Sequence, residues 1–243
     1  MKDIGNRYEI SSLTNDKVKL INSLHHRKYR REHNLFVAEG IRICREAAEN
    51  GWEIRYLLYD NLNIDTHIIE NLINDVLCLG ADVIGVTSEI LSKISHKENP
   101  QNILCVISQK WNDLPTIIKE KTFVALETVR DPRNLGTILR TIDGVGATDC
   151  ILLDHCTDPF SYESVRASMG AIFNVNIIAS SSKNFLKWKS KHKISLIGTC
   201  LINATDYTKT NWQLPFVLAM GNEQKGLSRN ILNACDQLIK LPM

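Results

Sequence analysis

The segment 122–147 constrains the fold of this chain more than any other, because it predicts a strand, a polar loop and a helix in succession. Its first five residues are an apolar run with the length and composition of a buried strand. In the loop, Pro132 disfavours helical backbone at the residue before it, so we expect Asn134 to be the helix N-cap. Gly144 or Gly146 can end the helix in a left-handed cap. The apolar face of the helix would consist of Leu135, Ile138, Leu139 and Ile142.

This arrangement can bind an anion. Ligands of open α/β sheets bind at the carboxyl ends of the strands, where the polar loop lies. The start of the helix offers backbone N–H groups and the positive end of the helix dipole. Arg130, Arg133 and Arg140 add positive charge, and Gly136 leaves room one turn before Arg140. An anion site and an ordinary capped surface helix both remain open for this segment taken alone.

The composition is that of a globular protein without a membrane span. The chain has 243 residues, which is long enough for one large domain or two ordinary ones. Of these residues 44% are hydrophobic and 23% are charged, as is typical of globular proteins. No apolar run approaches the roughly 18 residues of a membrane-spanning helix, and the polar N-terminus is not a secretory signal. We therefore expect a cytoplasmic protein. The net charge of +2 is too small to diagnose a nucleic-acid partner.

Cysteine usage predicts reduced thiols. The chain has seven cysteines, an odd number, and no C-x-x-C pair. Most of them sit within apolar runs, where a thiol behaves as a small apolar side chain. His155 and Cys156 are adjacent, but the sequence has no second such pair at the spacing of metal ligands. We therefore expect neither disulfides nor a metal site.

Residues 25–31, with the sequence His-His-Arg-Lys-Tyr-Arg-Arg, hold four permanent positive charges around one tyrosine. Such a segment can bind RNA phosphates, with Tyr29 stacking on a base. A helix end with an excess of solvated charge is the alternative, and the segment alone favours it. The four charged side chains are those of Arg27, Lys28, Arg30 and Arg31.

The chain divides into two α/β halves. Strand-like and helix-like patterns alternate through residues 35–107, which predicts a small α/β domain with a mostly parallel sheet. The polar, proline-containing segment 109–116 marks a junction, so we place the boundary between about residues 108 and 121. After residue 121 the alternation resumes, and an apolar run at 216–220 precedes the glycine-bearing loop 221–226. That loop is neither a Walker loop nor a dinucleotide fingerprint.

Three motifs follow one another along the chain. They are Asn134-x-Gly136-x-x-x-Arg140, Gly221-Asn-Glu223-x-x-Gly226 and Ile239-Lys-Leu-Pro-Met243. Together they resemble those of the SpoU (TrmH-type) RNA 2′-O-ribose methyltransferases of the SPOUT superfamily. The resemblance extends over nearly the whole chain. The basic segment leading into residues 36–40 is similar to the L30e-like substrate-binding domain of that family, and residues 165–173 are similar to a segment of its ribosomal-RNA-modifying branch.

The resemblance implies an α/β fold with an L30e-like RNA-binding domain at 1–108, a linker at 109–120 and a SPOUT domain with a trefoil knot at 121–243. It also implies S-adenosylmethionine as methyl donor, no metal, and a homodimer formed through the C-terminal domain. The implied reaction is methylation of a ribose 2′-hydroxyl in structured RNA, in 23S rRNA rather than tRNA. Motif three of the family continues beyond the point where this sequence stops. If the chain ends there, we expect an incomplete knot and weak donor binding. The alternative is a non-catalytic RNA-binding protein with a degenerate methyltransferase domain.

The resemblance also assigns residues to roles. Arg140 matches the arginine central to catalysis, Asn134 the asparagine that positions it, and Glu223 the motif-two glutamate. The family mechanism gives the proton to the arginine, but a guanidinium has no lone pair to accept one, so a clamp on the phosphate and the developing alkoxide is our preferred role. The donor-binding positions are Thr199, Leu218, Gly221, Ile239 and Leu241. In the family context, RNA contacts are expected from Arg27, Lys28, Arg30, Arg31, Arg133 and Arg166.

Overall fold

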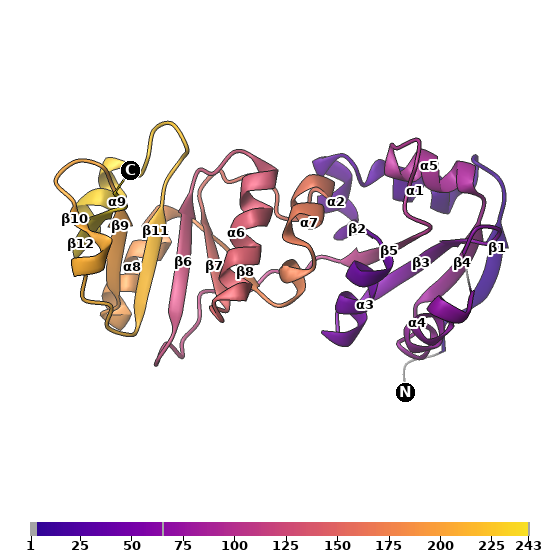
Figure 1. Ribbon diagram of the computed structural model, residues 1–243, viewed down its shortest axis with the longest axis horizontal. Coiled ribbons are helices and arrows are strands. Elements are labelled where there is room, and N and C mark those ends of the chain that lie inside the picture. Colours follow the sequence, from indigo (N-terminus) through magenta and orange to yellow (C-terminus); the bar gives the residue numbers. More distant parts are fainter. Residues whose placement is uncertain (1–3, 65, 243) are drawn as a thin grey trace. The chain divides into compact units, whose positions relative to one another are not determined.

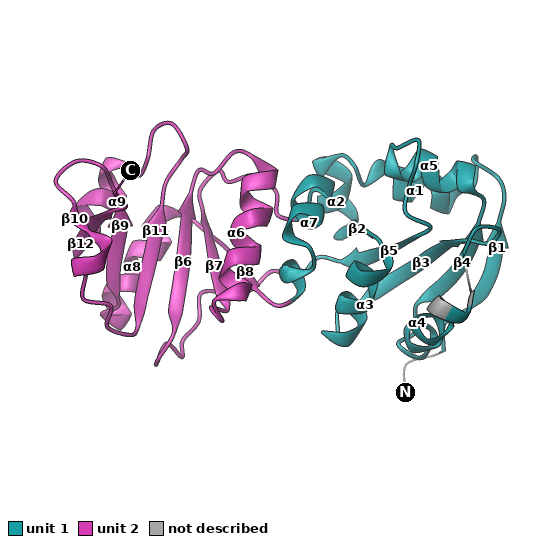
Figure 2. Cartoon of the chain, in the orientation of Figure 1, with its two compact units in different colours: residues 1–109, 160–173 teal, residues 110–159, 174–243 magenta. Residues whose placement is uncertain are grey.

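The computed structural model describes residues 4–64 and 66–242, and only the backbone of Thr66 and Ile68. The chain forms two compact units (Figure 2). The first contains the residues up to Gln109 together with the segment 160–173, and the second contains 110–159 and the residues from Asn174 onward. The segment 160–173 therefore belongs to the first unit, although the expected domain boundaries place it in the C-terminal domain.

A five-stranded sheet in the order β1-β4-β3-β5-β2 forms the centre of the first unit. Strands β1, β4 and β3 are parallel, whereas β5 runs antiparallel to both β3 and β2, so the sheet is mixed and not mostly parallel as expected. The helix between β4 and β5 spans only eight residues, or ~12 Å, and the chain enters β5 beside the carboxyl end of β3. The strands are β1 (Arg7–Ile10), β2 (Leu35–Glu39), β3 (Ile54–Asp60), β4 (Asp82–Val86) and β5 (Ile103–Ser108).

Helices of the first unit cover this sheet (Figure 1). They are α1 (Asp16–Ser23), α2 (Arg27–His33), α3 (Ile41–Glu49), α4 (Thr66–Cys78) and α5 (Ser88–Ser95). Thr87 is the N-cap of α5, because its hydroxyl accepts a hydrogen bond from the backbone N–H of Ile90. Val18 and Ile21 of α1 pack with Ile94 of α5 in one apolar cluster. The apolar residues of 66–79 recur at helical spacing, in agreement with α4, and of these the side chain of Ile68 lies outside the described part.

Aromatic packing holds the segment 160–173 in the first unit. This segment contains α7 (Tyr162–Ser168) and the short 3₁₀ helix η1 (Ala171–Phe173). The ring centroids of Phe36 and Phe160 are 4.9 Å apart, and those of Trp52 and Phe173 are 5.3 Å apart. The indole N–H of Trp52 donates to the carbonyl of Phe173 at 3.0 Å. These partners are about 120 residues apart in the sequence, so no local pattern could reveal the contact.

The second unit contains a seven-stranded sheet in the order β10-β12-β9-β11-β6-β7-β8, and every pairing in it is parallel. Its apolar core includes Phe123 of β6 and Trp188 of α8, whose rings meet edge to face, and Ile231 of α9. Helix α6 lies against β7 on the other face (Figure 1). The elements are β6 (Thr122–Glu127), α6 (Pro132–Gly144), β7 (Asp149–Leu153), β8 (Asn176–Ser180), α8 (Ser182–His192), β9 (Ser195–Thr199), β10 (Thr205–Asp206), η2 (Tyr207–Lys209), β11 (Phe216–Met220), α9 (Arg229–Ala234) and β12 (Gln237–Lys240).

The cysteines are all free thiols. Cys44, Cys105, Cys150 and Cys156 are buried, and Cys78 is exposed. Burial raises the pKa of the half-buried Cys235 thiol to about 11, with the nearby Asp236 carboxylate adding to the effect. Within residues 4–64 and 66–242 there is no group of three or more His, Cys, Asp or Glu side chains that could hold a metal ion. In the same part of the chain, every helix is too short or too polar to cross a membrane.

Candidate active site

Helix α6 begins at Pro132 and not at the expected Asn134. Asp131 is the N-cap, since its carboxylate accepts a hydrogen bond of 2.7 Å from the backbone N–H of Arg133. Proline suits the first helical position because its φ is already helical and its missing N–H would have no partner there. The expected N-cap at Asn134 is therefore wrong. Asn134 lies in the first turn of the helix, and its side-chain amide donates to Glu223 and not to the helix backbone.

The other end of α6 follows the prediction. Gly146 adopts a left-handed φ of 73°, and its N–H donates to the carbonyl of Asp143 at 3.0 Å. The N–H of Ala147 donates to the carbonyl of Ile142, also at 3.0 Å. This pair of hydrogen bonds is the Schellman motif, which ends the helix with a glycine in the left-handed region. Of the two candidate glycines, the left-handed one is therefore Gly146.

The loops after β6 and β11 meet at one edge of the sheet. These two strands are parallel neighbours, with Leu126 opposite Met220, so their carboxyl ends lie together. The side-chain amide of Asn134 donates to Oε1 of Glu223 at 3.2 Å, and that of Asn222 donates to the carbonyl of Thr128 at 3.0 Å. Two motif residues that are 89 positions apart in the sequence are thus in direct contact.

Glu223 is held as a carboxylate by its surroundings. Partial burial alone would raise the pKa of its carboxyl group. Hydrogen bonds from its own backbone N–H, from the Asn134 side chain and from the backbone N–H groups of Asp131 and Arg130 outweigh that effect, so the pKa is lowered. The loop of β6 therefore presents several donors to a side chain of the β11 loop, and the contact depends on the negative charge.

A buried carboxylate, which the sequence reasoning missed, links the same two segments. Glu127 ends β6 and is only 3% exposed. Its Oε2 accepts a hydrogen bond of 2.6 Å from the backbone N–H of Ser228, which is the N-cap of α9. A buried acceptor that bonds to a backbone N–H fixes the backbone that it binds. The available signal was an acidic residue that ends an otherwise apolar strand at the edge where ligands bind.

The β11 loop is folded tightly on itself. The backbone N–H of Asn222 donates to the carbonyl of Gly226 at 3.1 Å, and that of Gly226 donates back at 2.9 Å. This closure brings Gly226 against Gly221 so closely that a Cβ on Gly221 would lie 2.1 Å from the carbonyl carbon of Gly226. Only glycine fits at position 221 without displacing the loop.

A hollow of about 640 Å³ opens beside this loop, between the carboxyl ends of β9, β11 and β12. Apolar side chains such as Leu227 and Leu232 and the polar groups of the loop line it together, as is typical of small-molecule sites. Four of the predicted donor-binding residues are among its lining residues, and Glu223 is another. Leu218 is not among them, because it lies within β11 and packs against the apolar cluster of the sheet. The four are Thr199, Gly221, Ile239 and Leu241.

Arg140 lies on an exposed face of α6. Arg133 and Gly136 precede it at intervals that bring all three onto one side of the helix. Arg133 is also exposed, so both guanidinium groups are accessible from that side. The hollow beside the β11 loop has neither of these arginines in its lining, and Glu223, which does line it, contacts the same helix through Asn134.

The predicted RNA-binding residues differ in accessibility. Arg27, Lys28 and Arg31 are exposed on α2. Arg30 is only 4% exposed, and its Nη1 donates to the carbonyls of Leu24 and His25 at 2.7 Å each. Because these carbonyls follow the end of α1, the guanidinium completes the hydrogen bonding of that helix end. Its assignment as an RNA contact is therefore wrong.

Residues 121–243 match the model of the SpoU rRNA Methylase family. The chain belongs to this family. Residues 15–105 match the MRM3-like substrate binding domain, so each half of the chain has a counterpart. The resemblance expected from the three motifs is confirmed, and so is the α/β fold with an N-terminal substrate-binding domain. The trefoil knot and the individual roles of the site residues stay predictions.

Members and structural neighbours of the SpoU family align along nearly the full chain. A crystal structure of an rRNA methyltransferase from Sinorhizobium meliloti is 36% identical, with a TM-score of 0.92 over 98% of this chain and 91% of that chain. The SpoU methyltransferase AviRb from Streptomyces viridochromogenes, in complex with the cofactor AdoMet, is 26% identical, with a TM-score of 0.85 over 94% and 89%. The 23S rRNA (guanosine(2553)-2′-O)-methyltransferase RlmP of Bacillus subtilis is 26% identical over 235 residues, which cover 97% of this chain and 90% of RlmP.

Proposed function

We propose that this chain transfers the methyl group of S-adenosylmethionine to a ribose 2′-hydroxyl of 23S rRNA. The observation that carries the proposal is the contact between Asn134 and Glu223, which joins the two motif loops beside the hollow. The names of RlmP and of the other relatives agree with this reaction. With an rRNA substrate, the place of action is the cytoplasm.

The hollow suits the donor chemically. Its apolar side chains can cover an adenosyl group, and the backbone of the β11 loop can bind polar atoms. Thr199, Gly221, Ile239 and Leu241 would hold the donor. When bound, S-adenosylmethionine supplies an activated methyl group on a sulfonium, so the protein mainly has to align the acceptor oxygen and manage its proton.

Arg140 is the residue that would bind the acceptor. Its planar guanidinium can hold a phosphate oxygen and the developing alkoxide at the same time. Asn134 and Glu223 are positioning residues, because their hydrogen bond fixes the first turn of α6 relative to the β11 loop. Arg133, on the same side of α6, would add a phosphate contact.

Methyl transfer from labelled S-adenosylmethionine to 23S rRNA tests the proposal. Transcripts of the separate rRNA domains and total tRNA would be offered to the full chain, and the modified nucleotide would be mapped by nuclease digestion. We expect incorporation into one rRNA domain at a 2′-O position. RNA binding without any transfer would overturn the proposal and indicate a non-catalytic RNA-binding protein.

Asn134 and Glu223 are expected to act as a unit. Asn134→Ala and Glu223→Gln remove or weaken the same hydrogen bond, so each should slow single-turnover methyl transfer by about tenfold, and the double variant should be little slower than either. The folded-state pKa of Glu223 is lowered, so its charge is present at neutral pH and lost only as pH falls through that value. Additive losses in the double variant would show that the two residues act independently.

The basic helix α2 is expected to contact RNA through its exposed charges. Replacing Arg27, Lys28 and Arg31 with glutamine should weaken RNA binding and reduce the slope of log affinity against log salt by about 2–3, while donor binding stays intact. A matched control neutralises three exposed lysines of α8, and it should leave the slope unchanged. Equal slopes for both triple variants would show that α2 is a solvated helix end that does not contact RNA. The control residues are Lys183, Lys187 and Lys191.

The second unit is proposed to form a homodimer. Leu201, Ile202 and Leu241 are 68%, 73% and 59% exposed, and all three line the hollow. Exposed apolar groups of this kind favour a protein contact. Because they border the proposed donor site, a second copy of the chain could cover both. Sedimentation equilibrium at micromolar concentration should give twice the chain mass of 27.6 kDa, and a monomer would contradict the proposal.

A further inference from the structure

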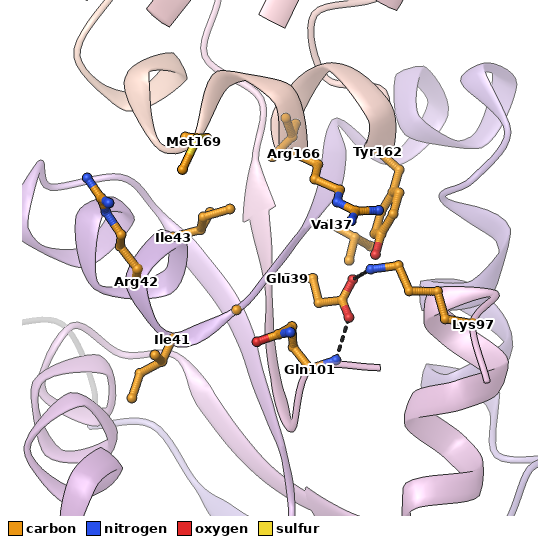
Figure 3. Close-up of a pocket in the computed structure, with 12 residues that line it drawn as sticks. Val37, Glu39, Ile41, Arg42, Ile43, Lys97, Gln101, Tyr162, Arg166 and Met169 are labelled. Carbon is orange, nitrogen blue, oxygen red and sulfur yellow. Dashed lines mark hydrogen bonds and ion pairs between the residues drawn. The ribbon is translucent and has the colours of Figure 1, made fainter. Parts of the chain in front are cut away.

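The first unit has a second hollow, of about 420 Å³, for which the proposed reaction gives no role. It lies between the end of β2, the start of α3 and helix α7 (Figure 3). Its volume falls in the range of about 300–1,000 Å³ that small-molecule sites occupy. The end of β2 and the start of α3 belong to the substrate-binding half of the sequence, whereas α7 lies about 120 residues further along.

One part of the wall is apolar. Ile41 and Ile43 of α3, Val165 of α7 and Met169 line it. Met169 is 45% exposed, so this thioether is accessible from solvent. An apolar wall of this size fits the face of a planar group such as a nucleobase.

The rim is cationic. Arg42 and Arg166 are exposed, and neither forms an ion pair within the part of the chain that the structure describes. Lys97, in contrast, is neutralised by Glu39, with Nζ and Oε2 2.6 Å apart. Glu39 also accepts a hydrogen bond from the backbone N–H of Gln101. Two arginines with uncommitted charge beside an apolar wall complement a molecule that is planar and anionic.

A polar group of the wall lacks a partner. The hydroxyl of Tyr162 is buried, and no residue in the described part of the chain bonds to it. It points toward Glu39 and Lys97, and Lys97 Nζ lies 5.2 Å from the centroid of the same ring (Figure 3). A buried hydroxyl without a partner is uncommon, and a ligand with a hydrogen-bonding edge would satisfy it.

We propose that this hollow binds one unpaired nucleotide of the RNA substrate. The base lies on the apolar wall with its polar edge toward Tyr162, and its phosphate lies against Arg166, which is beside that ring (Figure 3). Arg42, on the other side of the hollow, contacts a neighbouring phosphate of the RNA. Sequence-specific recognition of RNA uses unstacked bases of this kind, inserted into a protein pocket. The inference rests on the proposed function for the identity of the RNA. It extends the proposed function by assigning a site that binds a nucleotide away from the methylated ribose.

Methyl NMR of the full chain tests the site without requiring activity. The chain has four methionines, of which Met169 lines this hollow and Met220 lines the hollow beside the β11 loop. With ¹³C-methyl methionine, each of the four nucleoside 5′-monophosphates would be titrated in turn. We expect at least one of them to shift the Met169 signal in a saturable way. Met220 separately reports any binding in the proposed donor site.

Charge variants connect the hollow to RNA. Arg42→Gln and Arg166→Gln should each weaken nucleotide binding at Met169 and binding of the 23S rRNA fragment by about tenfold. Arg45→Gln is the matched control, because Arg45 is exposed on the same helix α3 and does not line the hollow. Its affinities should stay within twofold of the unmodified chain.

Three results would overturn the inference. One is an unmoved Met169 signal with all four nucleotides; another is inorganic phosphate shifting it as strongly as any nucleotide, which indicates a simple anion site. The third is unchanged RNA affinity in Arg42→Gln and Arg166→Gln. If rRNA is methylated normally while these results appear, the inference fails alone. If no rRNA is methylated but nucleotides shift Met169, the proposed function fails and the site remains.

Discussion

Replacing Arg140 with lysine is expected to slow methyl transfer by about 10²–10³-fold, while the affinity for S-adenosylmethionine stays unchanged. Lysine keeps the positive charge but loses the planar pair of donors that can hold a phosphate oxygen and the developing alkoxide together. Donor affinity should not change, because Arg140 is not among the residues that line the hollow beside the β11 loop. Single-turnover rates with 23S rRNA and calorimetric titration with S-adenosylmethionine measure the two quantities separately.

Arg45→Lys is the control for this substitution, since Arg45 is exposed in the first unit and lies in neither hollow. A near-normal rate in Arg140→Lys would exclude both a bidentate clamp and an arginine-specific base. The pH dependence separates those two roles in the unmodified chain. A clamp keeps its charge throughout the neutral range, whereas a guanidine that must first lose its proton gives a rate that rises about tenfold per pH unit.

The sequence predicted local structure most reliably where one short segment carries all the information. The strand, loop and helix of residues 122–147 are present, and so is the left-handed cap at Gly146. The start of α6 was misjudged because two rules compete there. Proline disfavours helix at the preceding residue, but Asp131 is the non-helical N-cap, so Pro132 itself can be the first helical residue.

Contacts between distant segments could be predicted only through the family motifs. Nothing in the local pattern brings Asn134 to Glu223, and parallel pairing of β6 with β11 is what places their loops together. The position of the segment 160–173 in the first unit depends on aromatic contacts with Phe36 and Trp52, which no periodicity encodes. Arg30 shows the same limit, because a basic helix pattern does not reveal that one of its arginines turns inward to bond two backbone carbonyls.

Gly221→Ala is expected to abolish tight donor binding, although it adds only one methyl group. That group would lie 2.1 Å from the carbonyl carbon and 2.3 Å from the carbonyl oxygen of Gly226, so the loop must move. The contacting atoms are backbone atoms and cannot turn away as a side chain would. Overpacking of this kind costs about 1–3 kcal/mol or more, and here the cost falls on the loop that borders the hollow. We expect the affinity for S-adenosylmethionine to fall by about 10²-fold.

Two other glycines provide controls that separate the clash from a general effect of losing glycine. A Cβ on Gly144, at the end of α6, would contact nothing within 4 Å, so Gly144→Ala should bind the donor normally. Gly226 also has open space around its Cβ position but a φ of 67°, so Gly226→Ala adds about 1–2 kcal/mol of backbone strain without a clash. Calorimetric titration should therefore give the highest affinity for S-adenosylmethionine in Gly144→Ala, a lower one in Gly226→Ala and the lowest in Gly221→Ala. Circular dichroism confirms that each variant is folded. Normal donor binding by folded Gly221→Ala would show that the donor does not occupy the hollow beside this loop.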